Sequence, residues 1–156
     1  MFDEPVRADW RFAPSTQLGG DSFGYHWLDD DHLAFYLLDV SGHGVGSSLL
    51  SVSAMNVLSL RTLPHVDFHD PAQVLAGLDA TFAMEKHNGK YFTVGYGVYR
   101  RSARELTYAG AGHPPAALLA GATREDASLQ LLESSGPFIG LGMELPFESI
   151  QVSLPS

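Results

Sequence analysis

Apolar residues follow two different periods along the chain, and each period predicts a type of element. Residues 22–28 and 32–39 have the composition of strands on either side of an acidic turn at 29–31, an arrangement that predicts a hairpin. The second strand is apolar on both faces, which favours a central position covered on two sides. A further strand is predicted over 6–12.

Two helices are expected next in the chain. The segment 40–60 contains no charged residue, and its apolar residues recur at helical spacing to about residue 63, so we expect a buried helix there. A second helix has clearer signals, because Asp70 suits the N-cap, Pro71 suits the first helical position and Asn88-Gly89 marks an end. The spaced apolar residues of the first helix are Val45, Leu49, Val52, Met55 and Leu58.

Beyond residue 90 the pattern changes to the alternation typical of strands. The strand candidates there are 91–99, 104–109, 115–119, 129–132 and 147–154. Strands, then two consecutive helices, then more strands do not follow the strict alternation of a Rossmann fold; they predict an α+β fold with helices packed on antiparallel sheets. Without an internal repeat or a linker, residues 1–156 are expected to form a single domain.

Composition narrows the possible functions. The chain has 18 acidic and 9 basic residues and a formal net charge of −9, which disfavours binding to nucleic acid or to anionic membranes. It has no cysteine, which excludes disulfides, thiolate zinc sites and a cysteine nucleophile, and we expect a cytoplasmic location. The uncharged segment 40–60 is too polar to span a bilayer, because it contains Ser47, Ser48, Ser51, Ser53 and Asn56 as well as two early glycines.

The segment from Leu38 to Gly44 is the first candidate for chemistry. Asp39 ends an apolar strand, where a carboxylate is costly unless a positive group pairs with it. Glycines at 42 and 44 allow a sharp turn into the following helix. From spacing alone, a cation-binding Asp39 and an Asp39 that only caps the turn are about equally supported.

A second carboxylate follows Gly19-Gly20 at Asp21. By itself this is an ordinary tight turn. If the two strands pair as a hairpin, however, Asp21 and Asp39 come together at one end of the sheet. Two neighbouring carboxylates without basic partners favour a hard divalent cation such as Mg²⁺ or Mn²⁺.

A third group is the turn from Ala109 to Pro115. Small residues followed by His113 and two prolines predict a rigid connection between strands. His113 could act as a general acid or contact a substrate, while a structural turn histidine is the plainer interpretation. The Gly-rich loop 136–142 is expected to have a similar turn role, with a lesser part in shaping a cleft.

Together these motifs resemble one family, the SpoIIE/RsbU-type PP2C serine/threonine phosphatases. Their order and spacing match over nearly the whole chain. The segments that carry the resemblance are Gly19-Gly20-Asp21, residues 39–44, Phe92-Thr93 with Tyr96-Gly97, residues 111–115 and residues 137–142.

The resemblance implies a fold and a mechanism. The fold would be a sandwich of two antiparallel β-sheets flanked by α-helices, with two Mn²⁺ or Mg²⁺ ions at one end. Asp39 would bridge the metals, the Val40 carbonyl would add a ligand, and Asp21 would bind a metal or its water. An activated water would then attack the phosphorus of a phosphoserine or phosphothreonine. The residues expected to shape the substrate cleft are Ser41, Gly42, His43 and His113.

The resemblance also implies partners. The substrate would be a phosphorylated protein of the anti-sigma-factor antagonist type, and a receiver or sensor domain would precede this domain in a longer protein. No nucleic-acid or membrane partner is expected.

The sequence departs from the family pattern at three places. Gly24 stands where many relatives have an acid, and Gly110 where many have Asn. The family's later Gly-Asp turn, Thr-Asp-Gly motif and Asp-Asp pair, which supply the remaining metal carboxylates, have no counterpart here. We therefore expect a domain that lacks its C-terminal part and carries half of the metal site. The alternative to a phosphatase is a catalytically impaired PP2C-like domain that binds a signalling partner.

Overall fold

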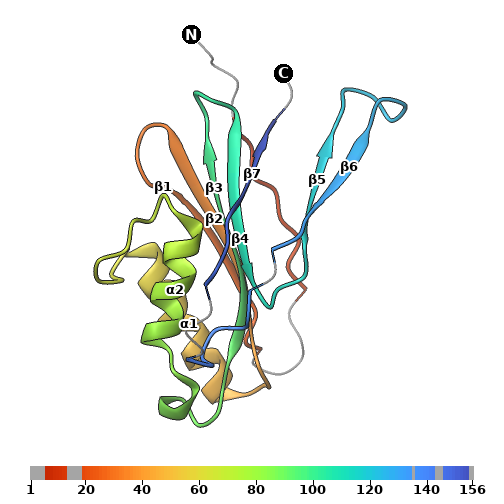
Figure 1. Ribbon diagram of the computed structural model, residues 1–156. Helices are drawn as coiled ribbons and strands as arrows, with labels where there is room; N and C mark the ends of the chain where they lie inside the picture. Colours follow the sequence, from red (N-terminus) through yellow and green to blue (C-terminus); the bar gives the residue numbers. More distant parts are fainter. Residues whose placement is uncertain (1–5, 14–18, 135, 143–145, 155–156) are drawn as a thin grey trace.

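One five-stranded antiparallel sheet organises the chain in the computed structural model (Figure 1). A separate antiparallel hairpin consists of β5 (Ala116–Ala120) and β6 (Ser128–Leu132). The structure describes residues 6–13, 19–134, 136–142 and 146–154, and the structural statements below concern these residues. The strands of the large sheet are, in spatial order, β1 (Ser22–Trp27), β2 (His32–Val40), β3 (Phe92–Arg100), β4 (Glu105–Ala111) and β7 (Ile150–Ser153).

Two helices cover one face of this sheet (Figure 1). Helix α1 (Val45–Ser59) packs on β1 and β2, and α2 (Pro71–Thr81) packs on β3 and β4. A single 3₁₀ turn, η1 (Met84–Lys86), follows α2. Neither helix in the described part of the chain combines the length and hydropathy that a membrane span requires. The prediction of an α+β fold with helices against antiparallel sheets is confirmed.

The main core lies between the helices and the sheet. Leu38 and Tyr96 from the sheet meet Leu58 and Leu78 from the helices, and all four side chains are almost fully buried. Burying each such side chain contributes about 1.5–3 kcal/mol. A smaller apolar cluster on the other face joins Leu106 and Tyr108 of β4 to residues of the β5–β6 hairpin, so that a second layer begins there.

Only part of the apolar stripe predicted for α1 is buried, since Leu58 lies in the core and Met55 packs against it. Val45, Leu49 and Val52 are exposed, with 63%, 62% and 55% of their surface accessible. Small residues face the sheet beside Leu50 and Leu58, because they allow the helix to approach closely and because the serine hydroxyls find partners nearby. The buried residues of α1 are Ser47, Leu50, Ser51, Ala54 and Leu58.

Two other boundaries differ from the sequence prediction. The strand predicted over 6–12 is irregular, because the aromatic rings of Trp10 and Phe12 pack on Phe23 without a backbone ladder. The second helix ends at Thr81, well before Asn88-Gly89. Beyond it, the Met84 amide donates to the Gly140 carbonyl at 2.9 Å, a long-range partner that continued helix would not allow.

The start of α2 matches its sequence signals. The Asp70 carboxylate accepts the Ala72 amide at 3.0 Å, and Pro71 occupies the first turn.

On the buried side of the same helix, the Asp79 carboxylate accepts the backbone N–H groups of Gly140 at 2.8 Å and Gly142 at 3.4 Å. Asp79 therefore holds the loop 136–142 against the helix. This loop in turn pairs with the first residue of β3, through Phe92 and Ile139.

We expect Asp79→Ala to destabilise the fold by about 1–3 kcal/mol, because two amides would lose their buried acceptor. Asp79→Asn is the matched control, since its side-chain oxygen can still accept one of them. Urea denaturation of both variants checks this. Equal midpoints for Asp79→Ala and the unmodified chain would show that the loop does not depend on this carboxylate.

Candidate metal centre

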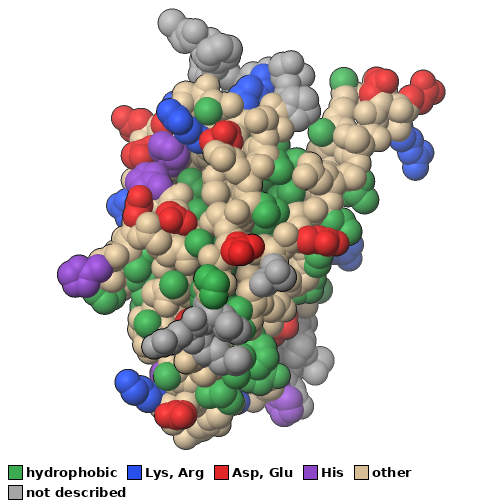
Figure 2. Space-filling view, viewed as in Figure 1, with side chains coloured by type: hydrophobic (Ala, Val, Ile, Leu, Met, Phe, Trp, Pro, Cys, Tyr) green, Lys and Arg blue, Asp and Glu red, His purple; other side chains and the backbone are tan. Residues whose placement is uncertain are grey.

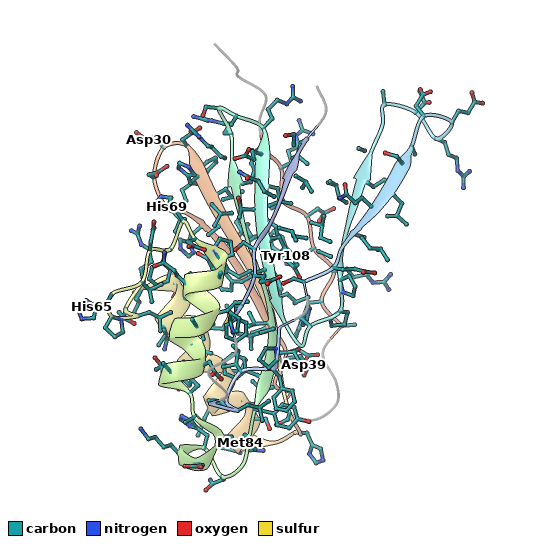
Figure 3. The ribbon with its side chains drawn as sticks, in the orientation of Figure 1. Asp30, Asp39, His65, His69, Met84 and Tyr108 are labelled. Atoms are coloured by element: carbon teal, nitrogen blue, oxygen red, sulfur yellow. The ribbon has the colours of Figure 1, made fainter. Side chains whose placement is uncertain are left out.

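Asp21 and Asp39 meet at one end of the β1–β2 hairpin. In the antiparallel register Ser22 lies opposite Leu38, so the residue before β1 lies beside the next-to-last residue of β2. The two carboxyl groups are close enough to share a hydrogen bond. The sequence-based expectation that pairing would bring these carboxylates together therefore agrees with the geometry. Figure 3 shows Asp39 at the lower end of the sheet.

The electrostatics of this pair are unfavourable without a cation. Asp39 is exposed overall, yet partial desolvation by the surrounding protein raises its pKa, and the hydrogen bond and negative charge of Asp21 raise it further. The four ion pairs found among the described residues involve neither carboxylate. Two like charges in contact without a basic partner are a common feature of metal and catalytic sites.

Because Gly20 has no side chain, the loop before β1 lies directly against the Val40 carbonyl at the end of β2. A Cβ atom at position 20 would lie 2.7 Å from both the Cβ and the carbonyl oxygen of Val40. The Val40 amide also donates to the Gly20 carbonyl at 3.4 Å. Only glycine permits this close approach between the loop before β1 and the end of β2. The Val40 carbonyl, predicted as a ligand, therefore lies directly against the Gly20–Asp21 loop.

Three serines of α1 hold the two acidic loops. Ser48 Oγ donates to the Gly19 carbonyl at 2.9 Å, and Ser51 Oγ lies 2.6 Å from Ser22 Oγ. Ser47 Oγ donates to the Ser41 carbonyl at 3.0 Å. These contacts explain why the inward face of α1 carries buried serines beside its core residues Leu50, Ala54 and Leu58. Sequence reasoning did not find this role, although an uncharged, serine-rich helix next to a Gly-rich turn was the available signal.

The turn 41–44 connects β2 to α1 in a conformation that needs glycine. Gly42 and Gly44 have φ angles of 79° and 89°. The Ser41 hydroxyl accepts the Tyr91 amide at 3.1 Å and so fastens the turn to the segment before β3. His43 is exposed and makes no hydrogen bond to the described part of the chain. The contact of Ser41 is structural, and the cleft-shaping roles of Ser41, Gly42 and His43 stay predictions.

His113 belongs to the same site. Its Nδ1 lies 3.0 Å from the Thr93 hydroxyl, and Thr93 is the cross-strand partner of Asp39. Burial lowers the pKa of His113, and the negative charge of Asp21 opposes this shift. The structure therefore brings His113 to the carboxylate pair and adds Thr93, which the sequence analysis noted only as part of a motif.

Position 24 has no room for the acid found in many relatives. Gly24 lies opposite Tyr36, and a Cβ there would be 2.7–2.8 Å from the Tyr36 ring and hydroxyl.

The metal ligands that the site offers are the Asp21 and Asp39 carboxylates and the Val40 carbonyl. These are all oxygens, the ligands that Mg²⁺ and Mn²⁺ prefer, and the uncompensated negative charge fits a cation.

Comparison with known proteins identifies relatives over most of the chain. The sequence model of the family described as Stage II sporulation protein E (SpoIIE) matches residues 29–156. Phosphoserine phosphatase RsbP of Bacillus subtilis is 28% identical over 158 aligned positions, which cover 98% of this chain and 37% of that protein. Phosphoserine phosphatase RsbU of the same organism is 26% identical, over 91% of this chain and 40% of that protein. The chain thus spans about two fifths of their length.

The fold has counterparts among solved structures. The SiaA-PP2C domain of Pseudomonas aeruginosa superimposes with a TM-score of 0.70 and 23% identity, over 88% of this chain and 52% of that one. At this identity the likeness shows the fold, which is that of PP2C domains.

We expect Gly20→Ala to destabilise the chain by about 1–3 kcal/mol, because the added methyl group would overlap the Val40 carbonyl. Gly19→Ala is the matched control, since among the described residues a Cβ there meets nothing closer than 4.0 Å. Denaturant unfolding of the two variants checks the difference. If both alanines are tolerated equally, the Gly20–Val40 contact does not constrain the site.

Proposed function

This chain belongs to the SpoIIE family of PP2C-type phosphatases, and we propose that it hydrolyses phosphoserine or phosphothreonine on a signalling protein with the help of Mn²⁺ or Mg²⁺. The observation that carries the proposal is the contact between the Asp21 and Asp39 carboxyl groups, which have no ion-pair partner among the described residues. A cation would remove the repulsion that the fold otherwise maintains.

The metal ligands of this proposal are Asp21, Asp39 and the Val40 carbonyl. When bound, a divalent cation supplies Lewis acidity that favours attack of water on a phosphate ester. Three protein oxygens leave positions for water or for further carboxylates, as is usual for Mg²⁺. The chain's own part is to hold these oxygens rigidly, and the contact of Gly20 with Val40 supports that role.

His113 is proposed to contact the substrate. It is half-buried, and its Nδ1 is held by the Thr93 hydroxyl, which leaves Nε2 to face a ligand. From this position it can donate a proton or a hydrogen bond to a phosphate oxygen or a leaving group. The turn 41–44 and the exposed His43 would form the neighbouring rim of the cleft.

The proposed substrate is a phosphorylated protein of the anti-sigma-factor antagonist type, in the cytoplasm. Two relatives named phosphoserine phosphatases support the phosphoserine part of this proposal. The exposed position of both carboxylates also suits a substrate as large as a protein, which needs an open site. The net charge of −9 argues against nucleic acid as the substrate.

We expect Asp39→Asn to abolish Mn²⁺ binding and to lower metal-dependent turnover of p-nitrophenyl phosphate more than about 100-fold. Loss of a residue that only hydrogen-bonds a metal ligand already lowers metal affinity or activity about 10–100-fold, and Asp39 is proposed to be a ligand itself. The metal-free variant should unfold at the same temperature as the unmodified chain or above it, since a repelling charge is removed. Calorimetric titration, thermal unfolding and the hydrolysis assay measure the three effects.

Asp30→Asn is the control for this experiment, because Asp30 is an exposed carboxylate at the other end of the hairpin. Unchanged Mn²⁺ affinity in Asp39→Asn would contradict the assignment of the metal ligands. Mn²⁺ binding without turnover would favour a domain that engages a phosphoprotein but does not hydrolyse it.

A further inference from the structure

A second group of metal-binding side chains lies at the opposite end of the β1–β2 hairpin. Asp29 is in the turn, His32 is the first residue of β2, and His69 lies just before α2. One ligand atom from each lies within 4.8 Å of the others. We propose that Asp29, His32 and His69 bind a transition-metal cation of the Zn²⁺ class, independently of Asp21 and Asp39.

The separations between the ligand atoms suit a tetrahedral ion. Asp29 Oδ2 lies 3.0 Å from His32 Nδ1 and 2.8 Å from His69 Nε2. Ligand atoms about 2.0–2.1 Å from Zn²⁺ are about 3.3 Å apart along a tetrahedral edge. Small outward movements of the two rings would therefore admit the ion. The fourth position would be open to water.

Neighbouring groups already orient two of the ligands. Asp67 Oδ1 lies 2.9 Å from His69 Nδ1 and also accepts the His69 amide at 2.9 Å, which directs Nε2 towards Asp29. A carboxylate behind a metal-binding histidine is a recurrent support that fixes the ring and its tautomer. The Asp29 carboxylate in turn accepts the amides of Asp31 at 2.7 Å and His32 at 2.8 Å.

The group is accessible from solvent. The side chains of His32, His69 and Asp29 are 26%, 41% and 45% exposed. Figure 2 shows histidine side chains beside carboxylates on this surface, and Figure 3 shows His69 and Asp30 far from Asp39. His32 and Asp39 are seven positions apart along β2, which corresponds to roughly 23 Å.

The ligand types distinguish the two sites. Two imidazole nitrogens and one carboxylate suit Zn²⁺, Co²⁺, Ni²⁺ or Cu²⁺, whereas oxygen ligands alone suit Mg²⁺ and Mn²⁺. Zn²⁺ should therefore select the histidine site at concentrations where Mn²⁺ does not.

A cation here would join two distant parts of the chain. Asp29 and His32 belong to the hairpin, and His69 belongs to the segment that carries the N-cap of α2, Asp70. The Tyr96 hydroxyl already fixes this segment by donating to the Phe68 carbonyl at 3.0 Å. The proposed role of the ion is thus to lock α2 and its leading loop onto the start of β2.

The test is a titration of the metal-free protein with Zn²⁺, with Co²⁺ absorption as the spectroscopic readout. We expect one Zn²⁺ per chain, visible Co²⁺ bands typical of a low-coordinate nitrogen-containing site, and a rise in Tm of about 5 °C at a hundredfold excess over Kd. His32→Asn and His69→Asn should each weaken Zn²⁺ binding at least tenfold. Asp39→Asn should leave the Zn²⁺ affinity unchanged.

His65→Asn is the matched control. His65 is exposed in the same loop with a φ angle of 58°, which asparagine tolerates, and its side chain points away from the cluster (Figure 3). It should bind Zn²⁺ like the unmodified chain. Asp67→Asn keeps all three ligands and should weaken binding about tenfold through loss of ring orientation.

Two outcomes would overturn the proposal. In the first, Zn²⁺ does not bind the unmodified protein, while His32→Asn and His69→Asn still lower Tm; the cluster is then a hydrogen-bonded clasp without a metal. In the second, all histidine variants bind Zn²⁺ equally, which would place the ion elsewhere. Neither outcome bears on the Mn²⁺ response of Asp39→Asn.

Discussion

The register between β1 and β2 is the constraint on which both candidate sites depend. Six consecutive residue pairs, from Ser22–Leu38 to Trp27–Leu33, fix this hairpin. At its open end the register places Asp21 beside Asp39, and at its closed end the turn places Asp29 within reach of His32. A shift by one residue would turn every side chain of β1 to the other face of the sheet, so neither site could form in another register.

Holding Asp21 and Asp39 together works against stability, and the surrounding structure must offset that repulsion. The glycine at position 20 allows the loop to press on Val40, while the hydroxyls of Ser48 and Ser51 tie the same loop to α1. Each such hydrogen bond contributes only about 0.5–1.5 kcal/mol. Several weak contacts acting on one short loop thus position a charged group that no single contact could hold.

Much of the fold and the carboxylate pair could be predicted from sequence because they depend on local patterns. Strand alternation and the Asp70-Pro71 start of α2 each reflect the geometry of one element, and Asp21 meets Asp39 through a hairpin with a short turn. The buried face of α1 could not be predicted from apolar spacing, because Ser47 and Ser51 are buried for their hydrogen bonds. The histidine cluster depends on a contact between residues 29 and 69, which no spacing rule encodes.

The two ends of the hairpin differ in a way that follows from ligand chemistry. Oxygen ligands at Asp21, Asp39 and Val40 form a hard, negatively charged site, while the nitrogens of His32 and His69 make the other end softer. Cations of different classes would therefore separate between the two ends of one rigid strand, β2. Because the backbone pairing fixes both ends together, an ion that tightens the closed end also limits the motion of the strand that carries Asp39. The two ends are connected through β2 and also through β3, which pairs with β2 from His32–Arg100 to Val40–Phe92.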